Sequence, residues 1–296
     1  MKKNEIRWLP ADQVSAIRSF ISNKEDLIKN DSFNKVLRDD IFRLLERQDC
    51  VVLYYPKDEE DNNGFHVEYP ICGELKHFIY INTAQLKETQ IFAAAHELGH
   101  TWKIVEYMNM SGFTGNDDWE ERIVNRFAAE LLMPEEEFRI FARREIVAEK
   151  TKHPQEQMST VSVIRTITAI MNEFLTPFKS VVYRLNELRV VADDVSVVLL
   201  DLYDEGIYRD YSRIVAKEQG YSRLYQPPDK LKYIYGLKEL LDKARDERAM
   251  PEKWLASMYA LFDFEYQRQD IALDSFLPDG ISIFEGGDAD AEDRGY

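Results

Sequence analysis

The sequence HELGH at 96–100 is the feature that most constrains this chain. Apolar residues at three- and four-residue spacing around it predict one helix from about Glu88 to Tyr107. Two histidines four residues apart differ by about 40° around a helix axis, so both imidazoles leave the same face. Neutral imidazole nitrogens are typical ligands of Zn²⁺. The pattern therefore favours a metal-binding helix over two unrelated surface histidines.

Glu97 lies between these histidines and adds a chemical role to the pattern. A glutamate one step after His96 can stand beside a metal ion without ligating it. From there its carboxylate can accept a proton from a water that the metal activates. Glu97 is therefore the candidate general base.

A catalytic zinc site needs a third protein ligand, and the ten residues after the motif, TWKIVEYMNM, contain no histidine. A second helix is predicted from about Trp119 to Leu132, with Asp117 or Asp118 as its N-cap. If the two helices are antiparallel, Glu120 or Glu121 would lie opposite the histidines, and the spacing leaves both open. Asn125 lies on the side of Glu121 and could hydrogen-bond a ligand imidazole.

Three short runs rich in β-branched and aromatic residues predict strands at 50–56, 64–69 and 77–83. We expect them to form a small antiparallel sheet, with 77–83 as the edge that an extended peptide could join. Helical periodicity dominates the remaining chain. The expected fold class is therefore α+β and mostly helical, with the sheet packed on the HExxH helix and a helical C-terminal region.

Composition excludes several classes of protein. Lys and Arg number 38 against 54 Asp and Glu, a net charge of −16, so no direct nucleic-acid binding is expected. The segment 180–191 carries only two arginines, Arg184 and Arg189, which favours a structural or partner-binding helix. The apolar runs are too short for a bilayer, and two cysteines make no disulfide framework. We therefore expect a cytoplasmic protein without membrane contact.

HELGH at 96–100, followed by EERIVNRFAAELLMP at 120–134, resembles the ImmA/IrrE family of metallopeptidases, which are zincin-like. The match is specific over roughly 64–134 and weaker over 135–191, where the family commonly has small helices similar to a winged-helix module. Val124 stands where the family usually has Ala. The resemblance implies that His96, His100 and Glu121 bind the metal and that Glu97 is the general base. It favours Glu121 over Glu120 because the family's ligand precedes the Asn by four residues.

The resemblance also implies a cofactor and a domain organisation. Zn²⁺ suits two histidines and a glutamate best, and Mn²⁺ or Fe²⁺ could occupy the same ligands. We expect a zincin-like domain that includes the N-terminal helices, a small winged-helix-like module, a helical region of unknown role and an acidic, disordered tail. These segments are 1–150, 151–195, 196–284 and 285–296.

The function implied is that of a zinc-dependent endopeptidase of narrow specificity. Its substrate would be a helix-turn-helix repressor or antitoxin, in a stress, mobile-element or toxin–antitoxin response. The alternative is a non-catalytic, metal-containing adaptor that sequesters a transcription factor. Glu97 favours the peptidase, because a binder would not need that carboxylate. His66, His77 and Tyr107 are all available to stabilise an oxyanion, and the residues do not choose among them.

Overall fold

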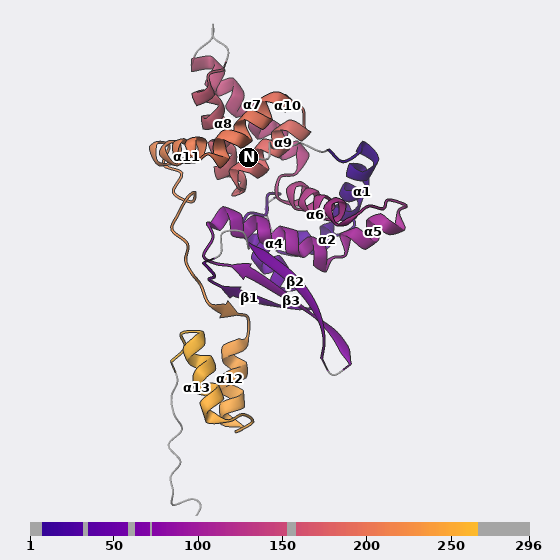
Figure 1. The fold of residues 1–296 in the computed structure, drawn as a ribbon, viewed down its shortest axis with the longest axis vertical. Coiled ribbons are helices and arrows are strands. Elements are labelled where there is room, and N and C mark those ends of the chain that lie inside the picture. Colours follow the sequence, from indigo (N-terminus) through magenta and orange to yellow (C-terminus); the bar gives the residue numbers. More distant parts are fainter. Residues whose placement is uncertain (1–7, 32–34, 59–62, 72, 153–157, 266–296) are drawn as a thin grey trace, which may run out of the picture. The chain divides into compact units, whose positions relative to one another are not determined.

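The computed structural model describes residues 8–31, 35–58, 63–71, 73–152 and 158–265 (Figure 1). The chain divides into two compact units, Met1–Lys243 and Ala244–Tyr296. The tail expected at 285–296 lies outside the described residues.

The first unit contains a four-stranded sheet in the order β2-β3-β1-β4. Its strands are β1 (Cys50–Tyr55), β2 (Gly64–Ile71), β3 (Glu74–Asn82) and β4 (Tyr233–Ile234). β2 and β3 form an antiparallel hairpin, whereas β1 runs parallel to β3. The expectation of a wholly antiparallel sheet is therefore wrong, and the sheet is mixed. The reason is that β2 follows β1 in the sequence but lies on the far side of β3 in the sheet. The chain reverses direction before β2 and again after it, so β1 and β3 run the same way.

The strand order also corrects the expected edge. β3 is paired on both sides, so the segment 77–83 cannot accept another strand. β2 is the edge strand on that side of the sheet, and β4 pairs with β1 at the other edge. On the β3 side of the sheet, the backbone groups that an extended peptide could pair with therefore belong to β2.

Helices α3 (Asp40–Glu46) and α4 (Lys87–Thr101) pack against the sheet, and α6 (Asp117–Leu132) packs against α4. Helix α1 (Ala11–Ser22) packs on α5 (Ile104–Met110) and α6, and α2 (Glu25–Asp31) packs on α3. Alternate strand residues such as Ile79 and Ile81 are buried in the same core as Leu98 and Phe127. The HExxH helix thus lies in the middle of the unit, where its position is determined by packing from the sheet and from α6.

The expected single helix from Glu88 to Tyr107 is wrong, because α4 ends at Thr101 and a turn follows it. Lys103 has a φ of 60°, in the left-handed region, and α5 begins at Ile104. The turn brings Ile104 and Met108 into the core, where neither is exposed. Burial of these two side chains outweighs the cost of a left-handed lysine, about 1–2 kcal/mol. His100 consequently lies in the last turn of α4.

A second group of helices follows α6 in the chain. It comprises α7 (Glu135–Lys152), α8 (Thr160–Phe174), α9 (Phe178–Glu187), α10 (Asp193–Asp204) and α11 (Ile207–Glu218). The part of 151–195 that the structure describes is helical and contains no strand.

Arg184 of α9 has no exposed surface and joins this group to α6. Its guanidinium donates to the Met133 carbonyl at 3.1 and 2.9 Å and to both carboxylate oxygens of Glu130 at 3.0 and 2.7 Å. The last carbonyls of a helix lack partners within the helix, so Arg184 satisfies one at the end of α6. This contact gives Arg184 a structural role.

The remaining helices are α12 (Leu237–Asp246) and α13 (Glu252–Leu261). Within the second unit, Leu255, Tyr259 and Phe262 are buried, and the ring of Phe264 lies against those of Tyr259 and Phe262. None of the described helices combines the length and the apolar character that crossing a membrane requires.

Candidate metal centre

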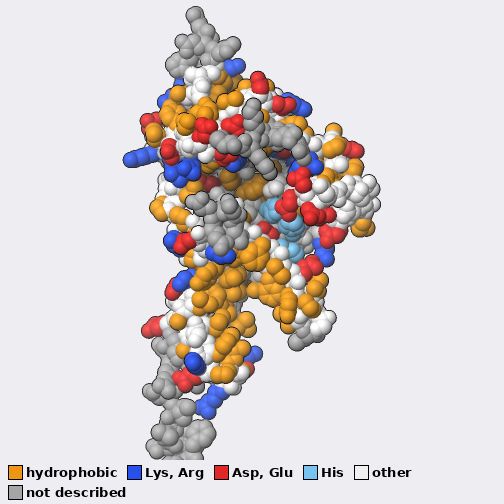
Figure 2. All heavy atoms as spheres, in the orientation of Figure 1, with side chains coloured by type: hydrophobic (Ala, Val, Ile, Leu, Met, Phe, Trp, Pro, Cys, Tyr) orange, Lys and Arg blue, Asp and Glu red, His pale blue; other side chains and the backbone are white. Residues whose placement is uncertain are grey.

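Three side chains from two helices converge on one point of the first unit. His96 and His100 come from α4, and their Nε2 atoms lie 3.2 Å apart. Glu121 comes from α6, with Oε2 at 3.4 Å from His96 Nε2 and Oε1 at 3.9 Å from His100 Nε2. Figure 2 shows histidine side chains gathered beside acidic ones on one face of the molecule. The structure therefore brings Glu121, and not Glu120, to the histidines.

Gly99 allows α4 and α6 to approach closely enough for this convergence. A Cβ atom at position 99 would lie 2.9 Å from Phe127 Cδ1 and 3.0 Å from Val124 Cγ1. Real Cβ atoms are almost never that close to other heavy atoms, so any larger residue would push the helices apart. The glycine inside the motif thus has a packing reason that is separate from the metal-binding pattern.

The start of α6 determines which of its residues face α4. Asn116, rather than Asp117 or Asp118, is the N-cap, and its Oδ1 accepts a hydrogen bond from the Trp119 N–H at 3.1 Å. Asn and Asp are similar N-caps, so composition alone could not choose among three consecutive candidates. With the helix starting at Asp117, Glu121 lies in its second turn, opposite the histidines.

Asn125 contacts the side of His96 that faces away from Glu121. Its Oδ1 lies 3.1 Å from His96 Nδ1. An amide oxygen only accepts hydrogen bonds, so Nδ1 is the protonated nitrogen of His96 and Nε2 keeps its lone pair. Asn125 therefore orients the His96 ring in the tautomer that a metal ligand needs.

The surroundings of His96 and His100 favour the neutral form of both imidazoles. Burial lowers the pKa of His96 and of His100, although the nearby charge of Glu121 acts in the opposite direction. Their ligand atoms and a Glu121 oxygen all lie within 4.8 Å of one another. In a tetrahedral site with bonds of about 2.0–2.1 Å, ligand atoms are about 3.3 Å apart. Two neutral imidazoles and one carboxylate at these separations fit a tetrahedral zinc ion that keeps a fourth position open.

Glu97 is buried beside this cluster, under the first residue of β2. A Cβ atom at Gly64 would lie 2.8 Å from the Tyr80 carbonyl oxygen and 3.2 Å from Glu97 Oε1. Burial, with a smaller contribution from the charge of Glu121, raises the pKa of Glu97 to about 8. A carboxyl group with a raised pKa next to a metal-ligand set is typical of a proton-transfer site.

The three residues considered for oxyanion stabilisation lie in different surroundings. The Tyr107 ring packs against Phe20 in the core, with centroids 4.9 Å apart. The His66 ring is stacked on that of His100, with centroids 6.3 Å apart, and His77 lies beyond His66. His66 is therefore the one of the three whose ring is stacked on a histidine of the HELGH motif.

Sequence motifs do not predict two further features near His96 and His100. Glu68 lies with His66 and His77 in a second group of potential metal ligands, which the strand register would have revealed because Glu68 pairs with His77. A cavity of about 560 Å³ borders Asn125, the residue that contacts His96. Its wall comes from helices far apart in the chain and includes Phe92, Arg122 and Tyr183. A cavity of this kind has no local sequence signal.

Two histidines on α4, a glutamate on α6 and a mixed sheet alongside define a zincin-like domain. Residues 45–186 match the family model of the peptidase M78 group, the IrrE N-terminal-like domain. This match supports an ImmA/IrrE-type metallopeptidase domain over these residues. No curated protein matches the chain.

Proposed function

We propose that the protein is a zinc-dependent endopeptidase with its metal on His96, His100 and Glu121 and with Glu97 as general base. The observation that carries the proposal is the convergence of the two histidine Nε2 atoms and the Glu121 carboxylate beside a buried Glu97. Zn²⁺ is the preferred metal, and Mn²⁺ or Fe²⁺ could use the same ligands.

An ion at this site would supply Lewis acidity, which lowers the pKa of a water molecule and polarises a peptide carbonyl. Glu97 takes the proton of the attacking water and later passes it to the leaving amine. The raised pKa of Glu97 suits both transfers, because the group can exist in either form near neutral pH. Asn125 holds His96 in the ligating tautomer throughout.

Substrate binding is assigned to the edge of β2 and to the cavity beside Asn125. An extended peptide can add to β2 through backbone hydrogen bonds, next to Gly64 and thus next to Glu97. The cavity of about 560 Å³ is large enough for one or two side chains and contains Arg122 and Lys179 in its wall. An acidic or amide side chain of the substrate fits these donors.

The proposed substrate class is a helix-turn-helix repressor or antitoxin, cleaved in a stress, mobile-element or toxin–antitoxin response. This class is what the resemblance of residues 96–134 to the ImmA/IrrE family implies, and the match of residues 45–186 to the IrrE N-terminal-like domain supports a peptidase that acts on a protein. The protein would act in the cytoplasm on a protein partner and without binding nucleic acid itself.

The test is incubation of the full-length, zinc-loaded protein with a helix-turn-helix protein encoded beside its gene, followed by mass spectrometry of the products. We expect a defined pair of fragments that disappears with Glu97→Gln and persists with Glu120→Gln, a neighbouring acidic residue outside the cluster. Glu97→Gln should retain the metal. Cleavage by Glu97→Gln would refute the role of the base, and a stable complex without any cut would favour the adaptor.

A further inference from the structure

A second set of metal-ligating side chains lies on the β2–β3 hairpin. His66 and Glu68 are two residues apart on β2, so they project from the same face of the strand. Glu68 is paired directly with His77 of β3 in the strand register. Directly opposite residues in an antiparallel pair have Cβ atoms about 4.5–5.5 Å apart, so the three side chains share one small area.

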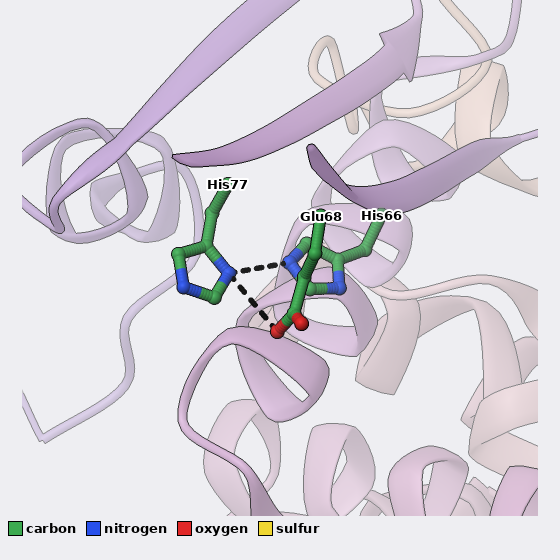
Figure 3. A group of neighbouring side chains, drawn as sticks. All are labelled: His66, Glu68 and His77. Atoms are coloured by element: carbon green, nitrogen blue, oxygen red, sulfur yellow. Dashed lines mark hydrogen bonds and ion pairs between the residues drawn. The ribbon is translucent and has the colours of Figure 1, made fainter. Parts of the chain in front are cut away.

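Their ligand atoms converge as they do at the first centre (Figure 3). His66 Nε2 lies 3.0 Å from His77 Nδ1, and Glu68 Oε1 lies 3.4 Å from the same nitrogen. One potential ligand atom from each residue lies within 4.8 Å of the other two. These separations are close to the edge of a tetrahedron around zinc, about 3.3 Å. Two imidazoles and a carboxylate are again a donor set for a borderline divalent cation.

The hairpin set shares no ligand with the first centre. The His66 ring lies between the ring of His77, with centroids 5.3 Å apart, and the ring of His100, with centroids 6.3 Å apart. Both ring pairs are nearly parallel, with interplanar angles of 11° and 9°. The two sets are thus neighbours with separate donors, and the side chains of His77 and Glu68 keep 19% and 36% of their surface exposed. Solvent can therefore deliver an ion and complete its coordination.

Among the described residues, Lys103 is the one lysine or arginine that forms an ion pair with this group. Its Nζ lies 3.7 Å from Glu68 Oε1, and the Lys103 side chain is 49% exposed. The ammonium group balances the charge of Glu68 while no cation is bound. Because it is half exposed, it can turn into solvent when a cation takes its place, so Lys103 should weaken cation binding without preventing it.

We infer that His66, Glu68 and His77 form a second binding site for a zinc-like divalent cation, next to the peptidase centre and independent of its ligands. An ion there would tie β2 to β3 beside the strand edge at which we place the substrate.

The experiment counts ions in the full-length protein. Chelator-treated protein is equilibrated with Zn²⁺, dialysed at a fixed free zinc concentration and analysed by elemental mass spectrometry. We expect two ions in the wild type, one in His77→Gln and two in Glu74→Gln, which removes an exposed carboxylate from the same hairpin. Zinc affinity at the second site should fall roughly 100-fold or more in His77→Gln and should rise in Lys103→Gln.

Circular dichroism of His77→Gln checks that the variant is folded, and Glu68→Gln provides an independent second variant. Two ions retained by both variants would overturn the proposal. A single ion in the wild type that Glu121→Gln removes and His77→Gln retains would also overturn it, while leaving the peptidase centre intact. Conversely, loss of one ion in His77→Gln and of the other in Glu121→Gln would support both sites separately.

Discussion

Gly99 lies directly against Phe127, and this contact sets the distance between the helix that carries the histidines and the helix that carries Glu121. The glycine belongs to the HELGH motif, yet its surroundings are those of a core residue. A substitution at Gly99 should therefore affect both the packing of α4 on α6 and the proposed metal binding.

Replacing Gly99 by Ala should destabilise the protein by about 1–3 kcal/mol, because the new methyl group overpacks the interface. It should also weaken metal binding by moving Glu121 away from the histidines. Urea unfolding and zinc titration measure the two effects. Val124→Ala removes one of the two clashing neighbours, so Gly99→Ala should cost less in that background. Equal cost in both backgrounds would contradict the packing argument.

Asn125→Ala should lower zinc affinity by about 10- to 100-fold, because His96 loses the acceptor that fixes its tautomer. The fold should be retained, since Asn125 is exposed and its hydrogen bond to His96 is a local one. Competition with a chromophoric chelator measures the affinity. Arg122→Gln, on the same helix and cavity wall, is the matched control. If Asn125→Ala bound zinc as tightly as this control, the positioning role would be wrong.

Glu130 and Arg184 should make the protein sensitive to acid. Burial alone would raise the pKa of Glu130, but the hydrogen bonds and charge of Arg184 outweigh it and lower the pKa to about 2. A lowered folded-state pKa gives stability that is present above about pH 4.5 and is lost as the pH falls towards about 2. The loss should be about 3 kcal/mol, measured by urea unfolding across this range.

Glu130→Gln tests the same pair by removing the charge. The variant removes the bidentate partner of the fully buried Arg184 and leaves Glu187 as its remaining ion-pair partner, so it should be less stable than the wild type at neutral pH by up to about 3–5 kcal/mol. Its stability should also change less between about pH 4.5 and about pH 2. An unchanged acid profile would show that other groups dominate acid unfolding.

Glu97 should make the free energy of unfolding of the metal-free protein fall with rising pH, the opposite of the effect of Glu130. Because its folded-state pKa is raised to about 8, the folded form holds a proton that the unfolded form has lost above about pH 4.5. The free energy of unfolding of metal-free protein should therefore fall as the pH rises towards 8. Glu97→Gln should flatten this part of the profile. Identical profiles in the two proteins would contradict the raised pKa.

The sequence predicted the grouping of His96, His100 and Glu121 more completely than it predicted the fold around them. His96 and His100 follow from helical geometry, and Glu121 from the family motif, because both signals are local. The β1–β3 pairing, the edge position of β2 and the strand β4 depend on contacts between distant segments, so periodicity could not reveal them. The helical periodicity of the sequence does not predict the turn at Lys103, because burial of Ile104 and Met108 overrides that periodicity.

The most direct test of the central claim is the zinc content of the wild type, Glu121→Gln and Glu120→Gln after dialysis against the same free zinc concentration. Elemental mass spectrometry should find one ion fewer per chain in Glu121→Gln than in the wild type, and no loss in Glu120→Gln. This comparison holds whether or not the hairpin binds a second ion. Equal zinc in all three proteins would show that Glu121 is not a ligand and would contradict the proposed metal centre.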